Sequence, residues 1–218
     1  MFQRSYIPAV IIITLLTAGT ACQSLRKRDP LSSELVIASP SVYESLSDQN
    51  LAATYQENLH NIYNAIRSRF KPNRLEFFLI SGICFRALQI KSTYNTYLSI
   101  NTKTSQLFSD NKTTFEQRAI TIFTSYTKHL LTLAAQEKEL LQDPALAGIM
   151  VNTRWKIERT LKKEYRTISF EEITLVAQKE QVDNYLSGTI TDQELLDQST
   201  IIALREDVDP QIIKLRLD

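Results

Sequence analysis

Residues 51–70, LAATYQENLHNIYNAIRSRF, decide the fold that the sequence predicts, because their apolar side chains recur every three or four positions. Such spacing draws one apolar stripe along an α-helix and differs from the alternation expected of a strand. Lys71-Pro72 ends the stripe, since the residue before a proline is pushed out of the helical region. The sequence therefore predicts a helix over 51–70, with a stripe formed by Leu51, Tyr55, Leu59, Ile62, Ile66 and Phe70.

The next stretch is the most apolar part of the chain after its N-terminal segment. It runs from Leu75 to Leu88, and we expect it to form a second, central helix that begins near Pro72 or Asn73. Residues 91–107 continue it but are rich in Thr, Ser and Tyr. These residues have poor helix propensity, so the sequence predicts a kink or a break there.

Helix-start signals recur through the rest of the chain. Thr113, Ser169 and Thr191 are each followed three residues later by Glu, the spacing of a capping box. Asp143-Pro144 and Asp209-Pro210 each place a favourable N-cap residue before a proline at the first helical position. We therefore expect helices over 113–141, 144–163, 169–188 and 191–204, and a short one from Pro210.

These signals together predict an all-α fold. Beyond residue 22 the chain has only Gly82, Gly148 and Gly188, too few for a turn-rich all-β protein. We expect a helical bundle of roughly six to seven helices over residues 48–218. A boundary near Asp143 would divide it into two subdomains, and a single bundle is the alternative.

The first 21 residues have the layout of a secretory signal peptide. Arg4 gives a positive start, Ile7–Leu16 is apolar, and small residues follow from Thr17 to Ala21. The apolar run is too short to cross the hydrocarbon core of a bilayer.

Gly19-Thr20-Ala21-Cys22 resembles the lipobox of bacterial lipoproteins. This resemblance implies that the chain is cut before Cys22, that Cys22 is lipidated, and that acyl chains hold it in the cell envelope. Gln23 follows the cysteine in place of Asp, which by resemblance to the enterobacterial sorting rule favours the outer over the inner membrane. Residues 22–47, with Pro30, Pro40 and many serines, then read as a lipidated N-terminus and a flexible tether.

Charge excludes some partners. Removal of residues 1–21 takes away Arg4 and leaves 24 basic side chains against 24 acidic ones. A neutral chain has no field that would draw it onto nucleic acid. Arg26-Lys27-Arg28 would add only modestly to membrane binding by acyl chains.

Cysteine usage is also restrictive. The only other cysteine, Cys84, lies in the apolar stretch Phe78–Phe85, where we expect a buried thiol. A lipidated Cys22 cannot pair with it. If the chain were instead cut after Ala21 by the ordinary signal peptidase, Cys22 would be free to form a disulfide with Cys84.

The sequence offers no catalytic, cofactor-binding or metal-binding motif. His60 and His129 lie on separate predicted helices, without a ligand spacing typical of metal sites. Glu171 and Glu172 are paired carboxylates, but their expected place in the first turn of a helix already explains them. Five aromatic residues have two interpretations: they line a groove that binds a peptide or a partner helix, or they simply pack in the core. These residues are Tyr94, Tyr97, Phe108, Phe123 and Tyr126.

We therefore expect a lipid-anchored envelope protein with a non-enzymatic binding or assembly role. Its partners would be the membrane, through Cys22, and an envelope protein. Two alternatives remain: an envelope enzyme whose site is assembled from scattered carboxylates and tyrosines, and a soluble periplasmic protein.

Overall fold

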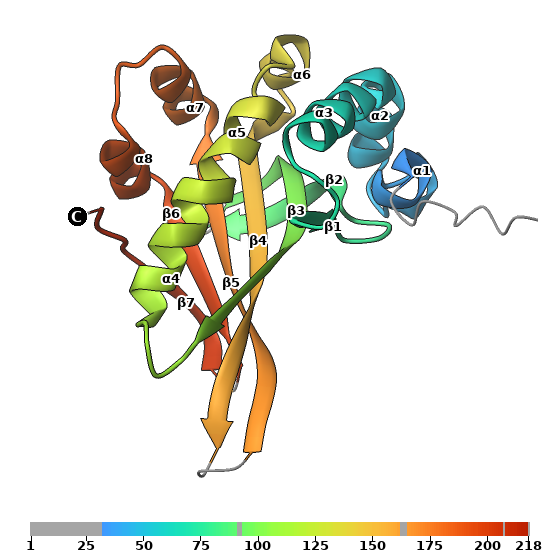
Figure 1. The fold of residues 1–218 in the computed structure, drawn as a ribbon. Helices are drawn as coiled ribbons and strands as arrows, with labels where there is room; N and C mark the ends of the chain where they lie inside the picture. Colours follow the sequence, from blue (N-terminus) through green and yellow to red (C-terminus); the bar gives the residue numbers. More distant parts are fainter. Residues whose placement is uncertain (1–31, 91–92, 162–164, 207, 218) are drawn as a thin grey trace, which may run out of the picture.

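The protein folds around one mixed β-sheet, with helices packed on one face (Figure 1). The computed structural model describes residues 32–90, 93–161, 165–206 and 208–217. Residues 1–31, and with them Cys22 and its signal segment, lie outside the described residues.

Among the described residues the sheet has seven strands: six follow the order β1-β3-β4-β5-β6-β7, and β2 lies off this path and pairs with β3. Strands β3 and β4 are parallel, and every other pairing is antiparallel. The strands are β1 (Leu75–Phe77), β2 (Ile83–Ile90), β3 (Thr93–Ser109), β4 (Leu146–Leu161), β5 (Tyr165–Gln178), β6 (Thr200–Arg205) and β7 (Val208–Ile213).

The helices lie before, between and after the long strands. A single turn of π-helix, η2, joins α4 to α5 in the crossover between the parallel strands β3 and β4. The helical segments are α1 (Ser33–Val36), η1 (Pro40–Val42), α2 (Leu46–Thr54), α3 (Gln56–Arg69), α4 (Phe115–Ile122), η2 (Phe123–Thr127), α5 (Lys128–Ala134), α6 (Lys138–Gln142), α7 (Lys179–Leu186) and α8 (Asp192–Gln198).

The main core lies between the helices and one face of the sheet. Because side chains alternate along a strand, Ile149, Val151 and Trp155 of β4 all face the helices. They join Leu59, Ile62 and Ile66 of α3 in one apolar cluster. The opposite face carries a smaller cluster of Tyr97, Met150 and Val176.

The prediction of an all-α helical bundle is wrong. Leu75–Leu88, expected to be a central helix, contains β1, a loop and most of β2. Residues 93–109 form β3, so the Thr and Tyr residues taken as a sign of a helix break are strand residues. β-Branched and aromatic side chains fit a pleated surface better than a helix, which accounts for this outcome.

The helices expected after Asp143, Ser169 and Asp209 are likewise strands. Asp143 accepts a hydrogen bond from the Ala145 amide in a turn that leads into β4, at 2.8 Å. The region 169–178 belongs to β5, and only its C-terminal continuation is helical, as α7. Pro210 lies in the edge strand β7, where a missing N–H group is tolerated.

Other helix signals are confirmed. The stretch 51–70 is largely helical, but it is divided between two helices, α2 and α3, which meet at Tyr55, and not one continuous helix as predicted. The Thr191–Glu194 capping box opens α8, although this helix ends at Gln198 and not at Leu204. The α4 capping box is displaced by one residue, to Thr114 and Gln117.

The chain from Ser33 onward packs against the body. Val36, Ile37 and Ala38 are buried, and Ile37 forms a parallel bridge with Ile83 of β2. Residues on both sides of 143 belong to the same sheet, since β3 pairs with β4 along most of its length.

Candidate binding groove around Arg205 and Glu171

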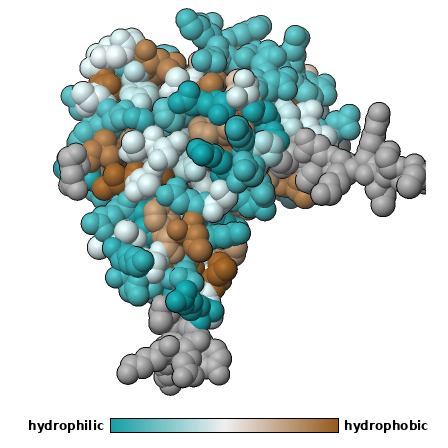
Figure 2. All heavy atoms as spheres, in the orientation of Figure 1, coloured by the Kyte–Doolittle hydropathy of each residue, from teal (hydrophilic) through white to brown (hydrophobic). Residues whose placement is uncertain are grey.

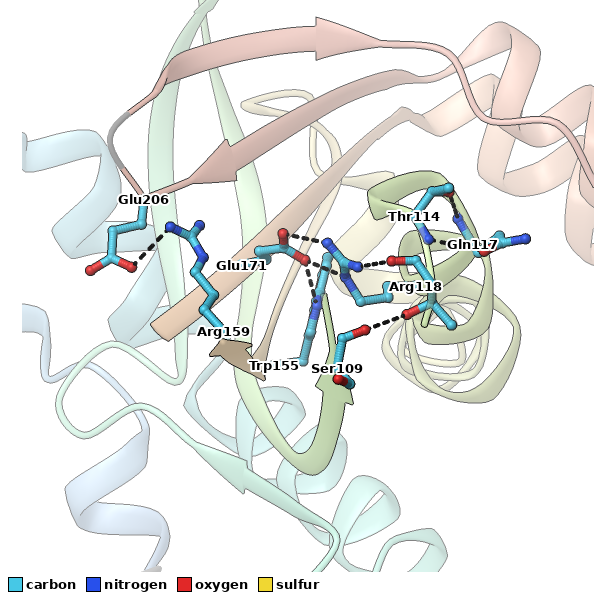
Figure 3. Close-up of polar contacts among 9 residues, drawn as sticks. Ser109, Thr114, Gln117, Arg118, Trp155, Arg159, Glu171 and Glu206 are labelled. Carbon is cyan, nitrogen blue, oxygen red and sulfur yellow. Dashed lines mark hydrogen bonds and ion pairs between the residues drawn. The ribbon is translucent and has the colours of Figure 1, made fainter. Parts of the chain in front are cut away.

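A buried ion pair between Arg118 of α4 and Glu171 of β5 closes one end of the core (Figure 3). The Arg118 guanidinium donates twice to the Glu171 carboxylate, from Nε at 2.8 Å and from Nη2 at 2.7 Å. The indole Nε1 of Trp155 donates to the same carboxylate at 3.0 Å. Only 5% of Arg118 and 3% of Glu171 are exposed, so the two charges depend on each other for solvation.

Local structure explains how these three side chains meet. Trp155 lies directly opposite Glu171 in the β4–β5 pairing, which brings their side chains to the same face of the sheet. At the start of α4, the Gln117 amide donates to the Thr114 hydroxyl at 3.2 Å, and the Thr114 amide donates to the Gln117 side chain at 2.9 Å. This reciprocal cap fixes the first turn of the helix, from which Arg118 reaches Glu171 and also donates to the Thr113 carbonyl.

Arg205 of β6, the strand next to β5, lies beside the Arg118–Glu171 pair. It lies opposite Glu171 in the β5–β6 register, and its guanidinium carbon is 5.1 Å from the centre of the Phe115 ring. It also donates to Gln211 of β7 at 3.0 Å. Beside it, Arg159 and Glu206 form a loose ion pair at 3.6 Å, as Figure 3 shows.

Two adjoining hollows open around these residues, and both are lined by Glu171, Arg205, Glu206 and Val208. The first, here called the apolar hollow, has a volume of about 610 Å³. Phe170, Leu204, Val208 and Pro210 form its apolar lining. The second, the polar hollow, has a volume of about 490 Å³ and is lined largely by charged and hydroxyl side chains: Asp110, Thr113, Thr114, Glu116, Arg118, Arg159, Glu171, Arg205 and Glu206.

Glu171 and Glu172 do not form a catalytic pair in this arrangement. They are neighbours on a strand and not in a helical cap, so their side chains point to opposite faces of the sheet. Glu172 accepts from Arg154 at 2.8 Å and from Asn152 at 2.5 Å. Both carboxylates border the apolar hollow, but each is already held by its own arginine, Glu171 by Arg118 and Glu172 by Arg154.

The chemistry of the groove suits a protein or peptide surface. The apolar hollow exposes 46% of Phe170, 37% of Leu204 and 38% of Val208. Arginine and glutamate side chains border these apolar groups. Exposed apolar side chains rimmed by charged ones are typical of interaction sites. Figure 2 shows hydrophobic side chains reaching the surface in patches, including the lower half of the body.

The two histidines, His60 and His129, contact different neighbours. His60 of α3 bonds through Nδ1 to the Gln56 carbonyl at 2.8 Å. In His129 of α5, Nδ1 lies 3.1 Å from Nη2 of Arg69, and the ring packs against Phe70. Partial burial, with help from Arg69 and Lys128, lowers the pKa of His129. Within the described residues, no three His, Cys, Asp or Glu side chains are placed to hold a metal ion.

The five aromatic residues considered for a tyrosine-lined groove do not form one groove: Phe108, Phe123 and Tyr126 belong to the main core or pack against it, and the other two lie elsewhere. Tyr97 is buried on the sheet face away from the helices, while Phe123 is buried in the main core. Tyr126 packs on Phe70, and Tyr94 is 72% exposed. Trp155 is fully buried between Phe108 and Phe115.

Cys84 is buried, as the sequence predicts. It is 6% exposed, and burial raises the pKa of its thiol. Its sulfur lies 3.6 Å from the Ser81 carbonyl and 3.6 Å from the Asn101 amide.

Of the groove residues, Glu171 was considered from the sequence, whereas Arg118, Arg154 and Arg205 were not predicted. A carboxylate in an otherwise apolar segment usually has an arginine partner, but this rule does not say which arginine, and it does not apply to Arg205, which contacts Gln211 and the Phe115 ring. No family model, no curated protein and no solved structure matches this chain.

Proposed function

We propose that the protein is a bacterial envelope lipoprotein, held in the membrane by acyl chains on Cys22, whose α/β domain binds a protein partner. The observation that carries the anchor is the sequence Gly19-Thr20-Ala21-Cys22 after the apolar run Ile7–Leu16. Gln23 favours the outer membrane as its location. None of the helices in the described part of the chain is long and apolar enough to cross a membrane.

The burial of Cys84 argues against Cys22 serving as its disulfide partner. A disulfide from Cys22 to Cys84 would require the Cys84 sulfur to be reached from outside. The thiol is instead covered, and it contacts Ser81 and Asn101. Cys22 is therefore better explained as a lipidation site than as a disulfide partner.

The binding role rests on the groove around Arg205. Its apolar hollow offers Phe170, Leu204 and Val208 to solvent. The nearby carboxylates Glu171 and Glu172 already accept hydrogen bonds from Arg118 and Arg154, which leaves them poorly placed as catalytic bases. A partner with apolar side chains and a few charged ones fits this surface.

Intact mass and membrane partitioning test the anchor. In a bacterial host, the mature chain should begin at Cys22, carry the mass of acyl chains and sediment with membranes. Cys22→Ser should lose both properties. Cys84→Ser is the matched control and should keep both, because its sulfur is buried in the body.

A mature chain that begins at Cys22 with an unmodified thiol would contradict the proposal. So would a Cys22→Ser variant that stays in the membrane fraction.

A further inference from the structure

The loop between β1 and β2 presents two large apolar side chains to solvent. Leu79 is 56% exposed and Ile80 is 64% exposed. Leu35 of α1, 45% exposed, adjoins them, because its carbonyl accepts a hydrogen bond from the Ile80 amide at 2.6 Å. We call Leu35, Leu79 and Ile80 the N-terminal apolar patch.

The loop is held rigidly in a strained form. Ile80 has a φ angle of +67°, which β-branched residues rarely adopt. Such strain persists only where the surroundings impose it. Here Asn101 does so: its side chain donates to the Ser81 carbonyl at 2.6 Å, and its amide donates to the Gly82 carbonyl at 2.7 Å.

Gly82 closes the loop against α1. A Cβ atom at this position would lie 2.7 Å from Cγ1 of Val36 and 2.6 Å from the Phe78 carbonyl oxygen. Only glycine permits this approach. The fold thus fixes Leu79 and Ile80 outward, against both backbone preference and the tendency of apolar groups to be buried.

The position of the patch relative to Cys22 indicates what covers it. The described chain begins at Ser32, directly before α1, and α1 lies beside the β1–β2 loop (Figure 1). The ten peptide links between Cys22 and Ser32 span at most about 35 Å, the length of a fully extended segment of that size. An acylated Cys22 therefore keeps the patch within reach of the bilayer surface.

We propose that the N-terminal apolar patch docks on the phospholipid bilayer that holds the acyl chains, with Leu79 and Ile80 inserted at the interface. This inference rests on the proposed lipid anchor. Apolar side chains beside a lipid anchor add a second membrane contact. Because the loop is rigid, that contact orients the domain: β1 and β2 face the membrane, and β7, at the opposite end of the strand order, faces away.

Tryptophan quenching in vesicles tests the docking. The chain has a single tryptophan, Trp155, which is fully buried, so an added tryptophan reports on its own site. Acylated full-length Leu79→Trp would be reconstituted into phosphatidylcholine vesicles brominated on the acyl chains. The matched control is Ile212→Trp, at a 74% exposed position on β7. After subtraction of the wild-type signal, we expect at least about twofold stronger quenching for Leu79→Trp, since bromine quenches only indoles at bilayer depth.

A second variant separates docking from mere proximity. Adding Ile80→Gly to Leu79→Trp removes one inserted side chain, and glycine accepts the positive φ angle, so the fold is kept. Quenching should then fall toward the Ile212→Trp level.

Equal quenching of Leu79→Trp and Ile212→Trp in protein whose mass shows acylation would overturn the docking and leave the proposed anchor intact. An unacylated Cys22 in the same preparation would overturn both.

Discussion

Glu171 carries a charge that the fold neutralises chiefly through Arg118. Both groups lie almost entirely inside the protein, and the pair is bidentate. Removing one partner of such a pair leaves the other charge buried without compensation, which costs about 3–5 kcal/mol. Glu171→Gln keeps an acceptor for the Trp155 indole but removes the charge. We expect the free energy of unfolding in urea at pH 7 to fall by about 3–5 kcal/mol.

The matched control is Glu158→Gln on β4. Glu158 pairs with Arg166 at 3.3 Å, but 73% of the Arg166 side chain is exposed. An exposed ion pair contributes at most about 1 kcal/mol. If the two substitutions lower the free energy of unfolding equally, the Arg118–Glu171 pair contributes less to stability than its burial indicates.

At the scale of elements, the sequence could predict helix ends better than it could predict strands. Capping depends on local side-chain hydrogen bonds, and those at Thr191 and near Thr114 are present. Gly188 has the positive φ angle, +75°, expected at the end of α7. These signals depend on a few neighbouring residues, but they are not sufficient alone, since the same spacing at Ser169 and Glu172 lies within strand β5.

Strand β5 shows why the rest could not be predicted. In a half-buried strand, apolar residues should face the core and polar ones the solvent. Near its start β5 does the reverse: Ser169 and Glu171 are buried, while Ile168 and Phe170 are exposed. The distant Arg118 makes burial of Glu171 possible, and nothing local to β5 indicates it.

The small number of glycines led to the wrong fold class for a related reason. Strands β3, β4 and β5 are 17, 16 and 14 residues long, so a large sheet is built with few turns. Few turns need few glycines. The candidate groove was not predictable either, because its residues come from α4, β4, β5, β6 and β7, which only the sheet topology brings together.

Asp192 links three helices. It accepts from Lys128 of α5 at 2.7 Å and from the Tyr185 hydroxyl of α7 at 2.7 Å, while lying in the first turn of α8. Burial raises its pKa, but the hydrogen bonds from Lys128 and Tyr185 outweigh this effect and leave the pKa below its usual value. The ionised form is therefore favoured by folding.

The sign of the pH dependence follows. A carboxyl with a lowered pKa stabilises the fold above its unfolded pKa of about 3.9, and this contribution is lost as the pH falls through the folded value. Asp192→Asn should lower the free energy of unfolding by about 1 kcal/mol at pH 7. The difference from wild type should shrink below about pH 4.

Urea unfolding across this pH range measures the effect. Asp183→Asn is the control, because Asp183 lies on α7 with an exposed side chain. A difference for Asp192→Asn that stays constant down to pH 3, well below the ordinary aspartate pKa of about 3.9, would contradict the assignment.

At the scale of the whole molecule, β4 joins the parts of the chain before and after residue 143. It pairs with β3 on one side and β5 on the other, and its Trp155 lies in the same core as Leu59 of α3 and Leu195 of α8. Neither half can complete this core without the other. The chain should therefore unfold as one cooperative unit.

Two probes of urea unfolding check this expectation. Trp155 fluorescence reports on the core, and far-UV circular dichroism reports on helices and strands throughout the chain. Their midpoints should coincide. A fragment ending at residue 142 lacks β4, and so leaves one edge of β3 unpaired and the helix-facing core uncovered. It should therefore show no cooperative transition. Separate midpoints, or a cooperatively folded fragment, would mean that the N-terminal half forms a domain of its own.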